Sequence, residues 1–212
     1  MKRPSLEKIL AMLAGSALVG ATVYSLKSNE TRADEHQLVK SVSEKKERKE
    51  FLDLDSLEYV TQFDKCEYDD PNQSGNRLFK VKEEDLEKYV SENFKLKEFV
   101  VTDGKVQEYA RISPLLIDGL QKLRDRVKKP VIVTSGYRSR GRQLELIKEE
   151  KEASKKSRHM SGDAADITVG GYSGEELAKM ARELFPNAGI GVEKSYIHLD
   201  FRGKRADWTY KN

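Results

Sequence analysis

The chain begins with one long apolar stretch in an otherwise polar sequence. Residues 9–26 carry no charge and follow a basic flank formed by Lys2, Arg3 and Lys8. A basic flank before an apolar run is typical of a secretory signal or an uncleaved signal anchor. These 18 residues would reach about 27 Å as a helix, near the thickness of a membrane core. We favour an anchor with its basic end in the cytoplasm and the rest outside; the alternatives are a cleaved signal and a buried core helix.

Helical spacing of apolar positions becomes regular only in the second half of the chain. Ser113 and Pro114 predict a capped start to a helix whose apolar face comprises Leu116, Ile117, Leu120, Leu123 and Val127. A second helix is expected over residues 142–152. Ser173 and Glu176 form a capping box that predicts the start of a third.

Strand patterns lie between these helices. Residues 131–133 predict a buried strand running into a turn at residues 135–139, and two further strands are expected at residues 165–169 and 196–201. Helices segregated around a small, mostly antiparallel sheet define an α+β fold. A short helix is also expected at residues 83–93.

The composition divides the chain into four parts. Residues 1–33 are a signal peptide or signal anchor, and residues 34–50 form a charged tether with eight charges between positions 40 and 50. Residues 51–92 are too short to fold alone and are expected to pack on the domain at residues 93–212. A chain of 212 residues supports one core of ordinary size, and we expect a monomer.

The net charge does not indicate a nucleic-acid partner. The formal charge is +3, but residues 1–33 hold five Lys or Arg against two Glu, so the remainder is neutral. Cys66 is the only cysteine, which excludes an intrachain disulfide.

Two of the three histidines lie in segments that suit a metal site. Zinc is held tetrahedrally by His and carboxylate ligands, and His159, Asp166 and His198 supply such a set. From these residues alone, the alternative is that they serve only structural hydrogen bonds. Asp166 follows His159 by an odd offset, so the chain must turn between them, which Ser161 and Gly162 permit. Strand alternation directs His198 and Asp200 to one face, where Asp200 could orient an imidazole.

Several ordered motifs resemble a known peptidase family. SRHMSGDAADI followed by YIHLD is similar to the zinc motif S-x-H-x-x-G-x-A-x-D, then H-x-D, of D-Ala-D-Ala carboxypeptidases and endopeptidases, the M15 family. The resemblance is strongest to the branch with a C-terminal peptidase domain, and the family is related in fold to the hedgehog signalling domain. Residues 93–99, the helix at 112–126, VIVTSGYRSR and Trp208 agree in order, so it covers residues 93–210.

The resemblance implies roles for individual residues. It implies zinc ligands at His159, Asp166 and His198, and a cleft position for Arg138, where a guanidinium suits a substrate carboxylate or an oxyanion. The alternative for Arg138 is an ion pair with a structural carboxylate. Three further residues are substrate-binding candidates: Ser135, Tyr137 and Gln143.

Two positions depart from the family pattern. Many members carry an acidic general base three residues before the last histidine, where this chain has Ser195. Asp163, Glu193 and Asp200 lie nearby in sequence, but we leave the base unassigned and expect Asp200 to orient. Gln143 stands where relatives often have Asn.

Together these features predict a zinc-dependent metallopeptidase, a carboxypeptidase or endopeptidase, that hydrolyses peptidoglycan stem or cross-link peptides outside the cytoplasmic membrane. The alternative is a non-catalytic, zinc-stabilised domain that binds cell wall or protein. A hydrolase needs a proton acceptor within reach of the attacking water, so the placement of the carboxylates discriminates between them.

Overall fold

The computed structural model describes residues 49–60, 68–149 and 153–210, which all belong to one compact unit, Lys49–Asn212. The predicted signal or anchor and residues 34–48 of the tether lie outside the described residues. Within the described ranges, no helix is long and apolar enough to cross a membrane.

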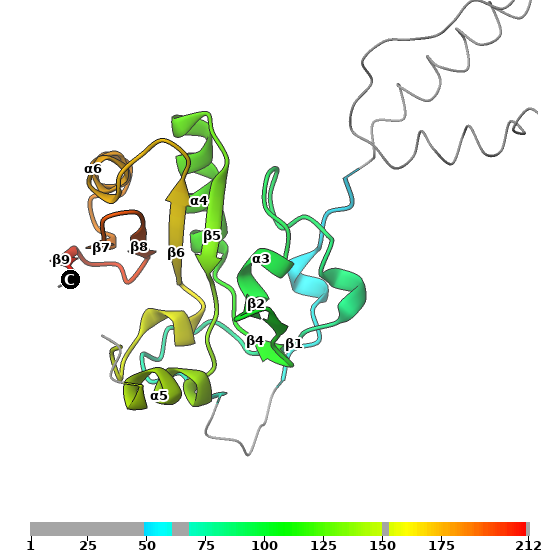
Figure 1. The fold of residues 1–212 in the computed structure, drawn as a ribbon. Helices are drawn as coiled ribbons and strands as arrows, with labels where there is room; N and C mark the ends of the chain where they lie inside the picture. Colours follow the sequence, from blue (N-terminus) through cyan, green and yellow to red (C-terminus); the bar gives the residue numbers. More distant parts are fainter. Residues whose placement is uncertain (1–48, 61–67, 150–152, 211–212) are drawn as a thin grey trace, which may run out of the picture. The chain divides into compact units, whose positions relative to one another are not determined.

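A five-stranded sheet forms the centre of the domain (Figure 1). Its strand order is β5-β6-β8-β7-β9, and every neighbouring pair is antiparallel except β7 and β9, which are parallel. The strands are β5 (Val131–Ser135), β6 (Ala164–Val169), β7 (Gly189–Val192), β8 (Ile197–Asp200) and β9 (Ala206–Thr209). The predicted α+β class with a mostly antiparallel sheet is therefore confirmed for the domain.

Two helices cover the apolar face of this sheet. Helix α4 (Pro114–Val127) buries the predicted apolar positions, and α6 (Gly174–Leu184) buries Leu177 and Ala181. Alternate residues of β6 and β8, including Ile167 and Leu199, complete the same core with exposures of 0%. The opposite face of these strands is left for polar side chains.

The ends of the helices follow local capping chemistry. The capping box of α6 is formed as predicted, with Ser173 and Glu176 each bonding the backbone of the other. Ser113 occupies the N-cap position of α4, but its side chain makes no capping hydrogen bond. Helix α5 (Arg140–Lys148) begins two residues earlier than predicted, because the Ser139 hydroxyl accepts from the Arg142 N–H.

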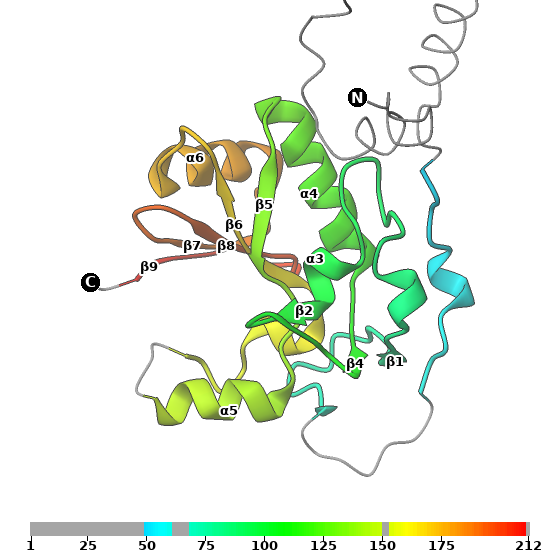
Figure 2. The ribbon, with the colours of Figure 1, turned by 45° about the vertical axis from the view of Figure 1, so that its right-hand side comes forward.

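The segment before residue 114 contributes short elements (Figure 2). Two small ribbons pair β1 with β4 and β2 with β3. The elements are η1 (Leu54–Ser56), β1 (Phe79–Lys80), η3 (Glu83–Asp85), α3 (Lys97–Val100), β2 (Val101–Thr102), β3 (Lys105–Val106) and β4 (Tyr109–Ala110). Phe79 and Phe99 are buried with α4 in one continuous core.

Two local predictions are wrong. Residues 83–93 do not form a helix beyond η3, because the backbone of Tyr89 bridges Phe51 and Lys95 instead of continuing helical bonds. Strand β5 is not buried on both faces: it lies at the edge of the sheet, and Ile132 is 52% exposed.

Candidate metal centre

One row of paired residues crosses the sheet and places the central part of the site. Ser135 on β5 pairs with Asp166 on β6, and Asp166 pairs with His198 on β8. The row continues from His198 to Gly191 on β7 and to Trp208 on β9. Directly paired residues on neighbouring strands project to the same face, so Asp166 and His198 lie side by side.

His159 is brought to this face by a short 3-10 helix, η4 (Arg158–Ser161). The helix ends at Gly162, which has φ of +70° and lies so close to the backbone of Arg111 that a Cβ would stand 2.3 Å from the Arg111 oxygen. Glycine is required there both for the left-handed conformation and for the close approach. The turn predicted between His159 and Asp166 is therefore confirmed.

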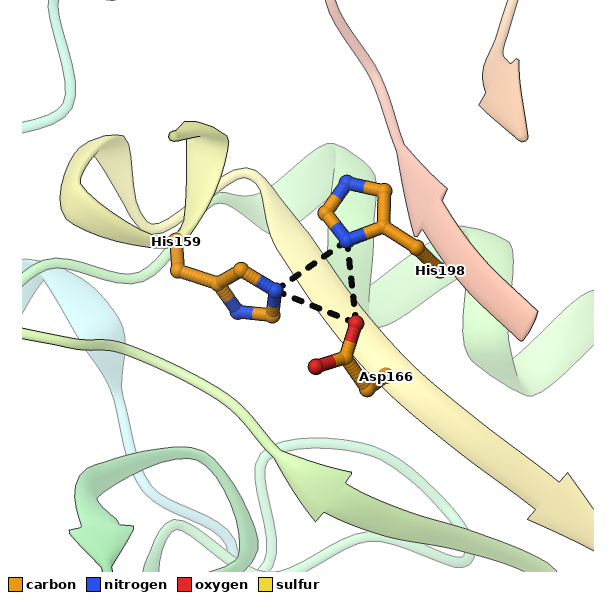
Figure 3. Close-up of side chains that lie close together, drawn as sticks. All are labelled: His159, Asp166 and His198. Carbon is orange, nitrogen blue, oxygen red and sulfur yellow. Dashed lines mark hydrogen bonds and ion pairs between the residues drawn. The ribbon is translucent and has the colours of Figure 1, made fainter. Parts of the chain in front are cut away.

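Three ligand-type atoms converge at one point (Figure 3). His159 Nε2 lies 3.1 Å from Asp166 Oδ1, and His198 Nδ1 lies 3.0 Å from the same oxygen. The two imidazole nitrogens are 3.1 Å apart. Around a tetrahedral metal with bonds of about 2.0–2.1 Å, neighbouring ligand atoms lie about 3.3 Å apart. The three atoms here would therefore have to move apart only slightly to bind such a metal.

The outer atoms of all three side chains are held by the protein. His159 Nδ1 lies 2.7 Å from the Gly136 carbonyl, and His198 Nε2 lies 3.2 Å from Asp200 Oδ2. Donation of the outer N–H of each ring leaves the inner nitrogen with its lone pair free for a metal. The second Asp166 oxygen accepts from Arg138 Nη2 at 2.5 Å. The chemistry of this donor set therefore fits a metal ion.

Burial and charge together set the ionisation of these groups. Burial alone would raise the pKa of Asp166, but His159 and His198 outweigh it and hold that pKa well below its usual value. Burial lowers the pKa of His159. For His198 burial acts in the same direction, but Asp166 and Asp200 outweigh it and raise the pKa. Asp166 is therefore an ionised carboxylate at neutral pH.

The three atoms lie in an open pocket of about 450 Å³. Four basic residues line it, whereas Asp166 is the one acidic residue among the described lining residues. The lining comprises Arg138, Gln143, Ala153, Ser154, Lys156, Ser157, Arg158, His159, Asp166, Tyr196, His198, Arg202, Trp208 and Tyr210.

Of the four predicted substrate-binding residues, two line the pocket and two do not. Arg138 and Gln143 line the pocket, and Arg138 makes an ion pair with the ligand candidate Asp166 rather than with a structural carboxylate. Ser135 does not line the pocket but accepts from Arg138 Nε at 2.9 Å. Tyr137 is 2% exposed in the core and is not among the residues that line the pocket. The geometry does not support a substrate contact by Tyr137.

None of the three neighbouring carboxylates lines the pocket. Asp200 is fully buried behind His198, where Arg202 also binds it. Burial raises the pKa of Asp200, but Arg202 and His198 outweigh it and lower the pKa. Glu193 accepts from the N–H and hydroxyl of Ser195, and Asp163 pairs with Arg158. The position of Asp200 suits orientation of His198.

Three aromatic residues form one wall of the pocket; the sequence analysis named Trp208 only as part of the family resemblance and did not predict this wall. Trp208 and Tyr210 come from β9 and the residue after it, and Tyr196 precedes β8. The centroids of the Trp208 and His198 rings lie 5.2 Å apart. Gly191 makes this approach possible, since a Cβ there would stand 2.4 Å from Trp208. The apolar residues at every second position, Ala206, Trp208 and Tyr210, were the sequence signal that could have predicted strand β9.

The fold and the site define a small α+β domain with a His-Asp-His cluster that could hold one metal ion in an open polar pocket. The sequence model of the Peptidase M15 family matches residues 90–200, and the chain belongs to this family.

Curated relatives agree with the family. The chain is 28% identical over 116 residues to the peptidoglycan L,D-endopeptidase MepK of Escherichia coli K12, covering 53% of this chain and 63% of that protein. MepK of Shigella flexneri matches with the same values. The chain thus spans less than two thirds of these relatives. Among solved structures, the L-Ala D-Glu endopeptidase ChiX of Serratia marcescens matches with a TM-score of 0.36 and 21% identity, over 43% of this chain and 82% of that one.

Proposed function

We propose that the chain is a zinc-dependent peptidase that cleaves peptide bonds in peptidoglycan. The convergence of His159 Nε2, Asp166 Oδ1 and His198 Nδ1 carries this proposal. Two imidazoles and one carboxylate with an open fourth position are the donor set of catalytic zinc sites. When bound, zinc would act as a Lewis acid that polarises the carbonyl of the peptide bond to be hydrolysed.

The protein contributes a rigid ligand set. The Gly136 carbonyl and the Asp200 carboxylate bond the outer nitrogens of the two imidazoles, which fixes the orientation of both rings before a metal ion binds. Asp200 is the orienting residue in this proposal. Asp166 and His198 lie on the neighbouring strands β6 and β8, so the sheet fixes two of the three ligand candidates, and η4 supplies the third.

Arg138 serves both the ligand set and the substrate. The described residues engage two of its five guanidinium N–H groups, at Ser135 Oγ and Asp166 Oδ2. The guanidinium also lines the pocket, so its remaining donors suit a substrate carboxylate or the oxygen that gains charge during hydrolysis. Gln143 adds an amide to the same wall.

The charge of the pocket favours an anionic peptide. Arg138, Lys156, Arg158 and Arg202 line it, whereas Asp166 is the one carboxylate among its described lining residues. Arg138, Arg158 and Arg202 already pair with carboxylates, so the attraction for a peptide carboxylate comes from Lys156 and from guanidinium N–H groups that these ion pairs do not use. The names of the MepK relatives support peptidoglycan as the substrate and an endopeptidase as the type of enzyme. The location outside the cytoplasm, with residues 9–26 as the membrane anchor, belongs to the same proposal.

One observation favours a second function. Among the described residues, no carboxylate other than the ligand candidate Asp166 lines the pocket, and Ser195 is exposed outside it. A domain without a separate acidic base suits a zinc-stabilised module that binds cell-wall peptides without cleaving them.

Metal analysis and muropeptide digestion of the purified full chain distinguish the two functions. For a peptidase we expect one zinc per chain and zinc-dependent products by mass spectrometry. His159→Ala, which removes one nitrogen ligand, should lose both. Stoichiometric zinc without cleavage of any muropeptide would favour the binding module, and unchanged zinc content in His159→Ala would refute the ligand assignment.

A further inference from the structure

A polar loop that precedes the family match contacts the turn that carries His159. Residues 69–76, here called the Asp70 loop, lie before the matched residues 90–200. Asp70, Asn72 and Asn76 make side-chain hydrogen bonds to the ends of η4. The loop thus touches the metal-ligand turn without contributing a ligand.

Ser161, the last residue of η4, depends on this loop for its polar contacts. Ser161 is 0% exposed, so its hydroxyl and carbonyl need partners inside the protein. The hydroxyl donates to Asp70 Oδ1 at 2.9 Å, and the carbonyl accepts from Asn76 Nδ2 at 2.8 Å. Loss of the loop contacts would leave buried polar groups of η4 unpaired.

Asn72 holds both ends of the short helix. Its Nδ2 donates to the carbonyl of Ser157, the N-cap residue, at 3.1 Å. The same amide donates to the Ser161 hydroxyl at 2.7 Å. One side chain therefore ties the two residues between which His159 lies.

The Asp70 loop is itself braced by internal bonds. Asp70 Oδ1 accepts from the Asn72 N–H at 2.9 Å, and Oδ2 accepts from the Ser74 N–H at 2.7 Å. Burial would raise the pKa of Asp70, but the bonds from Ser74, Asn72 and Ser161 outweigh it and lower the pKa. The charged acceptor at the centre of the loop strengthens each of these bonds.

A four-residue 3-10 helix has little stability of its own, because few hydrogen bonds offset the ordering of its backbone. His159 must nevertheless keep its Nε2 about 3 Å from two other ligand atoms. We propose that the Asp70 loop is a positioning element that holds η4 in place and thereby sets the affinity of the site for zinc. This inference rests on the zinc site of the proposed function.

Zinc titration of the full chain and its variants tests the role of the loop. Asn72→Ala removes both bonds to η4, and Asp70→Ala removes the central acceptor. We expect each change to weaken zinc binding by about 10- to 100-fold, the range for residues that support metal ligands. The dissociation constant is measured by competition with a chelating dye at a temperature where circular dichroism shows every variant folded.

Two further variants separate positioning from general stability. Asp53→Ala removes an acceptor of the Asp55 N–H in η1, away from η4, and should leave zinc affinity unchanged. Asn72→Asp keeps the size of the side chain but replaces the donor with an acceptor, so it should weaken zinc binding as much as Asn72→Ala. The Co²⁺-loaded Asn72 variants should also show an altered visible absorption spectrum.

The outcomes separate this inference from the zinc proposal. If Asp70→Ala does not fold, the two Asn72 variants decide the question. Wild-type zinc affinity and an unchanged Co²⁺ spectrum in both Asn72 variants would overturn the role of the loop alone. A wild-type chain that takes up no zinc would overturn the proposed zinc function, and this inference with it.

Discussion

At the scale of single residues, Ser195 occupies the place where many family members carry an acidic base. Its side chain is exposed outside the pocket, and its hydroxyl bonds Glu193. We predict that Ser195→Ala changes the rate of muropeptide cleavage by less than about twofold, because surface changes away from a site have small effects. Initial rates at saturating zinc measure this, and complete loss of turnover would assign Ser195 a role in the reaction.

Asp163 is a buried carboxyl that stands outside the ligand set. It is 4% exposed, and its Oδ1 has no hydrogen-bond partner among the described residues. Burial raises its pKa to about 6, against a lowering contribution from Arg158. Between about pH 4 and pH 6 the folded state therefore binds more protons than the unfolded state, and stability falls as the pH rises through this window.

Asp163→Asn should remove this pH-dependent cost. Asn resembles the neutral carboxyl, so we expect the variant to match the wild type near pH 4 and to be more stable by about 1–3 kcal/mol above pH 6. Urea unfolding across this range, with chelator present to keep nearby metal from changing the charge, measures the difference. A constant difference from pH 4 to pH 7 would refute the raised pKa.

At the scale of elements, the two long helices differ in how they are capped. Ser173 makes a full capping box on α6, whereas Ser113 on α4 makes no side-chain capping bond. We predict that Ser173→Ala lowers the free energy of unfolding by about 1 kcal/mol. Ser113→Ala is the matched control, and chemical denaturation should show a smaller loss for it; an equal loss would mean that the capping bond is not the cause.

Elements with a strong local signal were predicted well, and those without one were not. The apolar positions of α4 and the cap of α6 lie within their own segments, so the sequence pattern was sufficient. Strand β8 is as short as β7 and β9 but was predicted from the alternation in its IHLD sequence, whereas β7 has glycine at two of its four positions and β9 was overlooked despite its alternation. The helix expected at residues 83–93 failed because distant backbone groups pair with Tyr89.

At the scale of the whole molecule, zinc should act as a link between distant segments. The three ligand candidates come from η4, β6 and β8, which meet only in the folded chain. A ligand that binds only the folded state at 1,000 times its dissociation constant stabilises it by about 4 kcal/mol. For a domain of this size that corresponds to a rise in melting temperature of roughly 10 °C.

Calorimetry with and without zinc tests this expectation. His198→Ala removes one ligand and is the control, because its melting temperature should not respond to zinc. An equal rise in the wild type and in His198→Ala would show that zinc acts elsewhere on the chain.

Sequence patterns were enough to predict the α+β class and the main helices, and together with the family resemblance they picked out the three residues of the candidate metal site. Those signals are local: helical spacing, a capping box and short motifs around His159, Asp166 and His198. The pairing of Asp200 with His198 was also expected from strand alternation, whereas the Gly136 partner of His159 and the pocket wall became visible only in the folded chain. Trp208 reaches the site through strand register, and Gly136 and the Asp70 loop reach it through hydrogen bonds between segments far apart in the chain. No local sequence pattern encodes these contacts.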